Sequence, residues 1–275
     1  MTLQIDTQAR TRSSSSAPGV RARLLTLVLV PLFAFCGWAQ APAAKLPQSI
    51  IRYESVHHPI VGRHGMVASQ RALASAAGAE MLAQGGNAVD AAVAVGFALS
   101  VVLPRAGNIG GGGFMLIHLS EGQRNIAIDY REKAPAGAHA AMFLDAQGNV
   151  DQHLERFSHR AVGVPGTVAG LTHALERYGT MSLNQVLQPA IRLAEEGFPA
   201  DDDMVSAMAQ RLTKLRRYEA TRQAFFQPDG SLLKVGEPFV QAELATTLKR
   251  IAEGGKQAFY QGVIAEQIRR YPAVG

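Results

Sequence analysis

Arg131 is the residue of this sequence whose surroundings most clearly suggest chemistry. It lies in the segment DYREKAP, residues 129–135, beside Asp129 and ahead of Glu132 and Lys133. A guanidinium can hold a carboxylate through two parallel hydrogen bonds, a geometry that an ammonium group does not offer. The pattern alone also fits a solvated surface arginine, because most arginines are exposed.

Five glycines in the segment GNIGGGGFM, residues 107–115, suggest a phosphate-binding loop, but the spacing does not fit one. A P-loop requires lysine where this run has Gly113, and a dinucleotide fingerprint requires glycine where it has Met115. The run also follows a predicted helix and precedes a predicted strand, the reverse of the order in nucleotide-binding loops. We therefore expect a steric role, in which missing Cβ atoms leave room for another backbone segment or a substrate.

The sequence contains no other familiar catalytic pattern. It has no G-x-S-x-G element for a serine hydrolase, and its eight histidines show no metal-binding spacing, so neither a metal nor another cofactor is expected. The single cysteine, Cys36, lies near the N-terminus. The remainder of the chain therefore has no disulfide and no thiolate metal site.

The first 39 residues have the order of a secretory signal peptide. Four arginines precede the apolar run at 24–35, and the small residues Gly37 and Ala39 follow it. Twelve apolar residues that include Pro31 are too few for a permanent membrane span. We expect residues 1–39 to be a signal peptide and 40–60 to form an irregular lead-in. The mature protein is then expected to be periplasmic or secreted.

The charge of the chain gives no reason to expect nucleic-acid binding. The net charge is +5, but the first forty residues contain four arginines and one aspartate, so +3 of it belongs to them and only +2 to the rest. Apolar residues make up 47% of the chain and charged residues 18%, which indicates a globular protein with a core.

Two alanine-rich helices are predicted ahead of the glycine run. The first spans about residues 70–84 and ends at Gly85, because glycine adopts the left-handed cap conformation at low cost. The second spans 88–102, with Asn87 as its N-cap and Asp90 in its first turn, and is apolar on nearly all sides. The residues expected to be buried on the first helix are Leu73, Ala76, Met81 and Leu82.

A hairpin is predicted directly after the glycines, and helices dominate the rest of the chain. Alternation along the second strand should place Ile128 and Tyr130 on one face and Asp129 and Arg131 on the other. This order of elements favours a mixed α/β fold with helices layered on an antiparallel sheet. The predicted strands are 65–69, 114–120 and 125–132, and the predicted later helices are 167–178, 183–196, 202–217, 241–253 and 256–270.

Long strings of the sequence resemble the N-terminal part of γ-glutamyltranspeptidases, also called glutathione hydrolases. They are GMVAS, GGNAVDAAVAVGFALSVVLPRAGNIGGGGFMLIHLS, AIDYREKAPAGAHAAMFLD, GVPGTVAGLTHALERYGTMSLNQVLQPAIRLAEEGF and AFYQGVIAEQI, and together they cover about residues 51–270. The resemblance implies an N-terminal-nucleophile hydrolase fold, an αββα sandwich of two stacked sheets between helical layers. Residues 61–275 would be an incomplete large-subunit part of it.

The resemblance also implies an activity. Members of this family are precursors that cleave themselves into two subunits and expose a threonine, which attacks the γ-glutamyl amide of glutathione. The γ-glutamyl group then passes to water or to an amino acid. Arg131 would hold the α-carboxylate of the γ-glutamyl group, and the glycine run would bring the chain close to the substrate cleft.

The nucleophile of the family has no counterpart in this sequence. The family threonine stands in a T-T-H-[FY] context, whereas Thr246 and Thr247 are followed by LKR within a predicted helix. We therefore expect no catalytic residue in this chain, no activity of the chain alone, and a C-terminal half or small subunit as its partner, with glutathione and other γ-glutamyl compounds as substrates. Two alternatives remain: a β-lactam acylase of the same fold family, and a non-catalytic protein that binds γ-glutamyl compounds.

Overall fold

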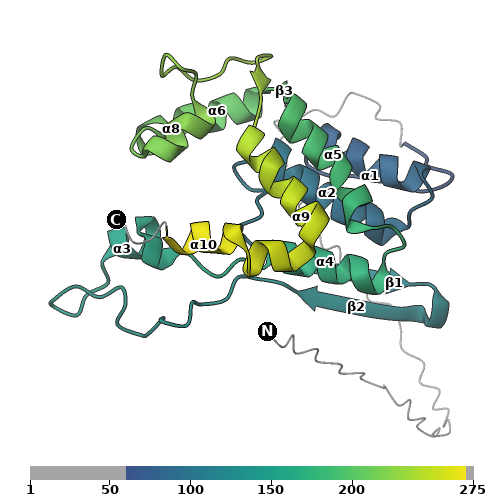
Figure 1. The fold of residues 1–275 in the computed structure, drawn as a ribbon, viewed down its shortest axis with the longest axis horizontal. Helices are drawn as coiled ribbons and strands as arrows, with labels where there is room; N and C mark the ends of the chain where they lie inside the picture. The colour runs from purple at the N-terminus through teal and green to yellow at the C-terminus, as the bar shows by residue number, and fades with distance from the viewer. Residues whose placement is uncertain (1–59, 271–275) are drawn as a thin grey trace, which may run out of the picture. The chain divides into compact units, whose positions relative to one another are not determined.

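The computed structural model describes residues 60–270 (Figure 1). Residues 1–61 and residues 62–275 form two separate units, and every helix and strand described below belongs to the second unit. The predicted signal peptide, at 1–39, and the lead-in up to residue 59 lie outside the described residues. None of the helices in the described part is both long enough and apolar enough to cross a membrane.

The predicted helix pair is present as α1 (Ala72–Ala83) and α2 (Ala88–Val102). Gly85 makes the reversal between them with a φ of +91°, a conformation that side chains disfavour. The side chain of Asn87 accepts hydrogen bonds from the backbone of Val89 (2.8 Å) and Asp90 (3.1 Å), and Asp90 accepts one from the backbone N–H of Asn87 (2.7 Å). This capping box fixes the start of α2 as the sequence predicted.

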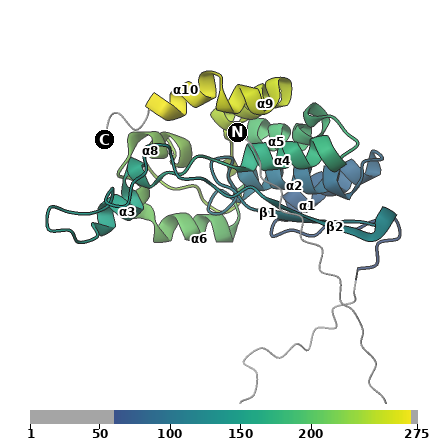
Figure 2. The ribbon, with the colours of Figure 1, turned by 90° about the horizontal axis from the view of Figure 1, so that it is seen from below.

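Helix α2 forms the centre of the helical layer. It packs against α1, α4 (Thr167–Tyr178) and α5 (Leu183–Glu196), and α5 packs in turn against α9 (Ala242–Tyr260). Figure 2 shows the hairpin on one side of these helices and α9 on the other. The largest side chains of this core that are fully buried are Phe97, Met81, Leu187, Leu248 and Ile251.

The hairpin consists of β1 (Phe114–Leu119) and β2 (Arg124–Asp129), paired antiparallel from Phe114↔Asp129 to Leu119↔Arg124. The short η1 helix (Glu121–Gln123) makes the turn. Ile117 and Ile128 are buried, whereas Phe114 and Leu116 remain exposed. One face of the hairpin therefore covers the helices, and the alternation predicted for the second strand is confirmed.

Shorter elements complete the described part. The two-residue strands β3 (Phe198–Pro199) and β4 (Pro238–Phe239) pair antiparallel. The remaining helices are α3 (Gln152–Phe157), η2 (His159–Ala161), α6 (Asp202–Gln210), α7 (Leu212–Leu215), α8 (Glu219–Phe225) and α10 (Val263–Arg270).

Three predictions about local structure are wrong. Residues 65–69 form no strand. The buried face of α1 is made by Ala74, Ala77 and Met81, whereas Leu73 and Ala76 are exposed, because small residues let α1 approach α2 closely. The helix predicted at 202–217 is two helices that meet at Arg211.

The mixed helix and strand class is confirmed. The described residues contain two sheets of two strands each, β1–β2 and β3–β4. The two larger stacked sheets of the predicted αββα sandwich are not seen in the described residues.

Candidate functional site

Arg131 is exposed and lies two residues beyond β2, because the strand ends at Asp129 and not at residue 132 as predicted. Its backbone N–H donates to Asp129 Oδ1 (3.0 Å), and its guanidinium carbon lies 5.9 Å from the centroid of the Phe114 ring. Within residues 60–270 the guanidinium has no hydrogen bond to another side chain and no ion pair. Its five N–H donors therefore have no hydrogen-bonding partner within that part of the chain, and a guanidinium can pair with a carboxylate.

The glycine run packs directly against the backbone that carries Arg131. A Cβ atom at Gly112 would lie 2.5 Å from the carbonyl oxygen of Tyr130 and 2.7 Å from Cα of Arg131. A Cβ atom at Gly166 would lie 1.8 Å from the same carbonyl oxygen. Only glycine fits at such distances, so the run has the steric role that the sequence analysis favoured over phosphate binding.

Hydrogen bonds join the glycine run to the start of α4. The carbonyl oxygen of Gly111 accepts from the backbone N–H groups of Gly166 (2.7 Å) and Thr167 (2.9 Å). Lys133 and Val164 exchange two backbone hydrogen bonds of 3.1 and 2.8 Å. The Arg131 backbone is thus held between the glycine run and the turn before α4.

Tyr260 supports this arrangement from the helical side, and Tyr130 precedes Arg131 in the chain. The hydroxyl of Tyr260 donates to the carbonyl oxygen of Pro165 (2.9 Å) and accepts from the backbone N–H of Ala169 (3.2 Å), which ties α9 to the start of α4. Burial raises the pKa of both tyrosine hydroxyls, so both stay protonated near neutral pH. Neither is placed to act as a base.

The threonines weighed as nucleophiles are engaged within a helix. The hydroxyl groups of Thr246 and Thr247, both in α9, donate to the carbonyl oxygens of Ala242 and Glu243, each at 3.0 Å. This local bonding is typical of helical threonines. Among the described residues no group of three or more His, Cys, Asp or Glu side chains could hold a metal ion.

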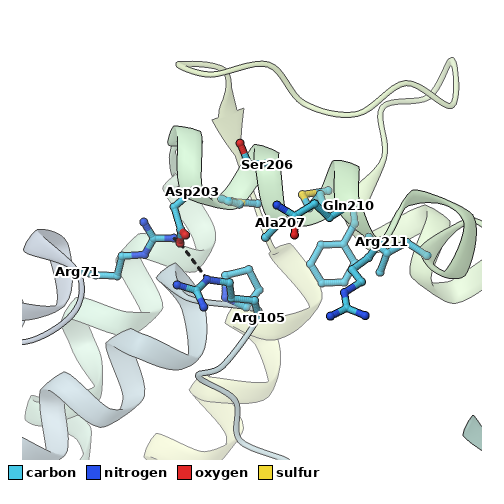
Figure 3. Close-up of a pocket in the computed structure, with 12 residues that line it drawn as sticks. Arg71, Arg105, Asp203, Ser206, Ala207, Gln210 and Arg211 are labelled. Carbon is cyan, nitrogen blue, oxygen red and sulfur yellow. Dashed lines mark hydrogen bonds and ion pairs between the residues drawn. The ribbon is translucent and has the colours of Figure 1, made fainter. Parts of the chain in front are cut away.

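The sequence analysis missed a charged cluster that joins α6 to the helix pair (Figure 3). Arg71 donates to both Asp201 and Asp203, and Arg105 Nε donates to Asp203 Oδ2 (2.9 Å). Asp201 also caps α6 by accepting from the backbone N–H of Met204 (2.8 Å). No spacing rule links residues about a hundred or more positions apart, so the sequence carried no signal for the ion pairs.

Comparison with known proteins connects the Arg131 region to a family. A family model described as Gamma-glutamyltranspeptidase matches residues 74–271. Over 230 residues the chain is 50% identical to a glutathione hydrolase proenzyme from Escherichia coli strain K12, a match that covers 84% of this chain and 39% of that protein. The chain thus spans well under half the length of this relative.

Solved structures agree with the sequence match. The crystal structure of Helicobacter pylori γ-glutamyltranspeptidase matches with a TM-score of 0.76 and 45% identity, over 78% of this chain and 61% of that chain. A cephalosporin acylase from Bacillus halodurans matches with a TM-score of 0.64 and 30% identity, over 80% of this chain and 43% of that chain. The family model covers most of the residues described here and the fold agrees with it, so the chain belongs to the γ-glutamyltranspeptidase family.

Proposed function

We propose that this chain provides the part of a γ-glutamyltransferase, or glutathione hydrolase, that binds the γ-glutamyl donor. The observation that carries the proposal is the Arg131 guanidinium, which has no hydrogen-bonding or ionic partner among the described residues while its backbone is fixed by the glycine run. The 50% identity to a glutathione hydrolase proenzyme supports glutathione as the donor.

The proposed reaction divides the work between two parts of the enzyme. Arg131 binds the α-carboxylate of the γ-glutamyl group by two charge-assisted hydrogen bonds and so orients the γ-amide. A threonine hydroxyl of a partner segment, the C-terminal half or small subunit, attacks the γ-carbonyl carbon and forms an acyl-enzyme with loss of the amine. Water or an amino acid then takes the γ-glutamyl group. The chain alone is expected to be inactive.

The fold and location of the complete enzyme are part of the same proposal. The hairpin β1–β2 would join strands of the partner segment in an αββα sandwich, which would also cover the exposed Phe114 and Leu116. The order of basic, apolar and small residues at 1–39 supports export to the periplasm or the medium.

A fusion protein tests the role of Arg131. Residues 1–270 of this chain would be joined to the part of the E. coli relative that lies beyond the matched region, and self-cleavage would report folding. We expect Arg131→Lys to lower kcat/KM for a γ-glutamyl donor about 10- to 100-fold, because one ammonium cannot replace a bidentate fork. Arg124→Lys, at an exposed arginine that begins β2, is the matched control. A fusion that cleaves itself normally and keeps its kcat/KM after Arg131→Lys would contradict the assignment.

A β-lactam acylase is the second candidate, favoured by the structural match to the cephalosporin acylase. A glutaryl group keeps the terminal carboxylate of a γ-glutamyl group but lacks its α-amino group, so Arg131 would then meet a different acyl group. The same fusion, assayed with γ-glutamyl and glutaryl anilides, distinguishes the two. A higher kcat/KM for the glutaryl compound would favour the acylase.

A further inference from the structure

We propose that a cavity between α6 and the ends of the α1–α2 helix pair binds small organic anions in which an apolar body adjoins a carboxylate or phosphate group (Figure 3). The cavity has a volume of about 610 Å³, which is in the range of small-molecule sites. Neither Arg131 nor the glycine run lines it. The inference therefore does not rest on the proposed function.

Three arginines from three separate segments bring positive charge to this cavity. Arg71 precedes α1, Arg105 follows α2, and Arg211 lies at the end of α6. Asp203 is the one carboxylate among the residues that line the cavity. Asp201, which is not among these lining residues, also pairs with Arg71, so the three arginines exceed the two carboxylates by one positive charge, and this favours an anionic ligand.

The ion pairs inside the cavity leave donors unused. Asp203 Oδ2 accepts from Arg71 Nη2 (3.1 Å) and from Arg105 Nε (2.9 Å), which leaves both Nη groups of Arg105 without a partner in the described part of the chain. Arg211 forms no side-chain hydrogen bond or ion pair with residues 60–270, and Figure 3 shows its guanidinium apart from the other two arginines. A ligand oxygen could therefore bind Arg105 or Arg211 without breaking an existing contact.

The other side chains of the cavity define the rest of the ligand. Met204, Met208, Leu215, Phe225 and Pro104 give it apolar walls, and burial of an apolar body against such walls is favourable. The spacing of Asp203, Ser206 and Gln210 places them on one face of α6, where the hydroxyl and the amide add neutral hydrogen-bonding groups. This combination fits an amphipathic anion better than a bare inorganic one.

Calorimetry with a set of related probes tests the ligand class. The 275-residue chain would be titrated with octanoate, 1-octanol and inorganic phosphate at low ionic strength. Octanoate should bind at least about tenfold more tightly than octanol, which lacks the charge, and than phosphate, which lacks the apolar chain. Equal affinity for octanol would overturn the anion site, equal affinity for phosphate would overturn the apolar subsite, and no binding of any probe would overturn both.

Two variants with opposite expected effects test the residues. Arg211→Gln should weaken octanoate binding about fivefold, the effect of losing one exposed ionic contact. Asp203→Asn should strengthen it by a similar factor, because the variant removes the one negative charge among the lining residues, which repels the anionic group of the ligand. Asp201 still caps α6 in that variant, so the helix should remain folded.

The exposed Arg177 on α4 provides the matched control, since Arg177→Gln should leave octanoate affinity unchanged. Thermal melting by circular dichroism would confirm that each variant is folded. If Asp203→Asn melts like the parent chain and binds octanoate more weakly, the proposed repulsion by the Asp203 charge is wrong. If Arg177→Gln weakens binding as much as Arg211→Gln, the effect is one of overall charge and the cavity is not the site.

Discussion

Asp90 is a buried carboxylate whose hydrogen bonds outweigh the cost of its burial. Its side chain is inaccessible to solvent and accepts from Thr180 Oγ1 (2.7 Å) and from the backbone N–H groups of Asn87 (2.7 Å), Thr180 (2.9 Å) and Met181 (3.0 Å). Burial by itself would raise the pKa of Asp90, but these bonds lower it below its usual value. Asp90 thereby joins the start of α2 to the turn between α4 and α5.

Asp90→Asn should destabilise the fold by about 2 to 3 kcal/mol at pH 7, because an amide leaves at least one of these buried donors unpaired. The folded pKa is lower than the unfolded value of about 3.9, so the stabilisation is complete above that value and is lost as the pH falls through the folded pKa. Urea unfolding at several pH values measures both effects. The exposed Glu253→Gln is the control, and a difference between wild type and Asp90→Asn that stays constant down to pH 2 would contradict the linkage.

At the scale of elements, the glycine run and the strand β2 form one packed unit. Gly112→Ala should cost about 1 to 3 kcal/mol, because the new methyl group would meet the backbone of Tyr130 and Arg131 at 2.5 to 2.7 Å. Gly137→Ala is the matched control, since nothing lies within 4 Å of a Cβ atom there, and it should leave stability unchanged or slightly raised. Equal denaturation midpoints for the two variants would show that the glycine run accommodates the methyl group without loss of stability, against the prediction.

The contact between α9 and α4 depends on one hydroxyl. Tyr260→Phe should lower the free energy of unfolding by about 1 to 2 kcal/mol, because Pro165 O and Ala169 N lose their shared partner. Tyr218→Phe removes a hydroxyl from a tyrosine that is 46% exposed and should have little effect. Urea denaturation of both variants measures the difference. If Tyr260→Phe lowers the free energy of unfolding no more than Tyr218→Phe does, the Tyr260 hydroxyl does not stabilise this contact.

The ends of elements were predictable where a local signal sets them. Helix α2 begins after Asn87 as predicted, and the predicted ranges 167–178 and 183–196 agree with α4 and α5. The short helices α3 and α8 were missed: α8 has no side-chain cap, whereas Asp151 caps α3 and was not recognised as a signal. Pattern also failed for α1, where contact with α2 buries alanines in place of the larger Leu73.

For the candidate site, the sequence indicated Arg131 and the glycine run but not what holds them. The steric role of the run was predictable, because missing Cβ atoms are visible in sequence. Its actual neighbours, Gly166 and the turn before α4, lie more than fifty residues further along the chain. The Arg71–Asp203 pair is a tertiary contact of the same kind, which local pattern cannot reveal.

At the scale of the whole molecule, the outer face of the hairpin should make the 275-residue chain self-associate. Leu116 is 84% exposed and Phe114 64% exposed, side by side on one face of β1. An apolar face on a two-stranded sheet with unpaired edges favours association. Leu116→Thr should therefore shift sedimentation velocity profiles towards the monomer, whereas Val235→Thr, which is 58% exposed, should not. If the wild-type chain sediments as a single monomer at concentrations of tens of micromolar, the exposed face of β1 does not cause self-association. The argument that a partner sheet must bury this face would then fail.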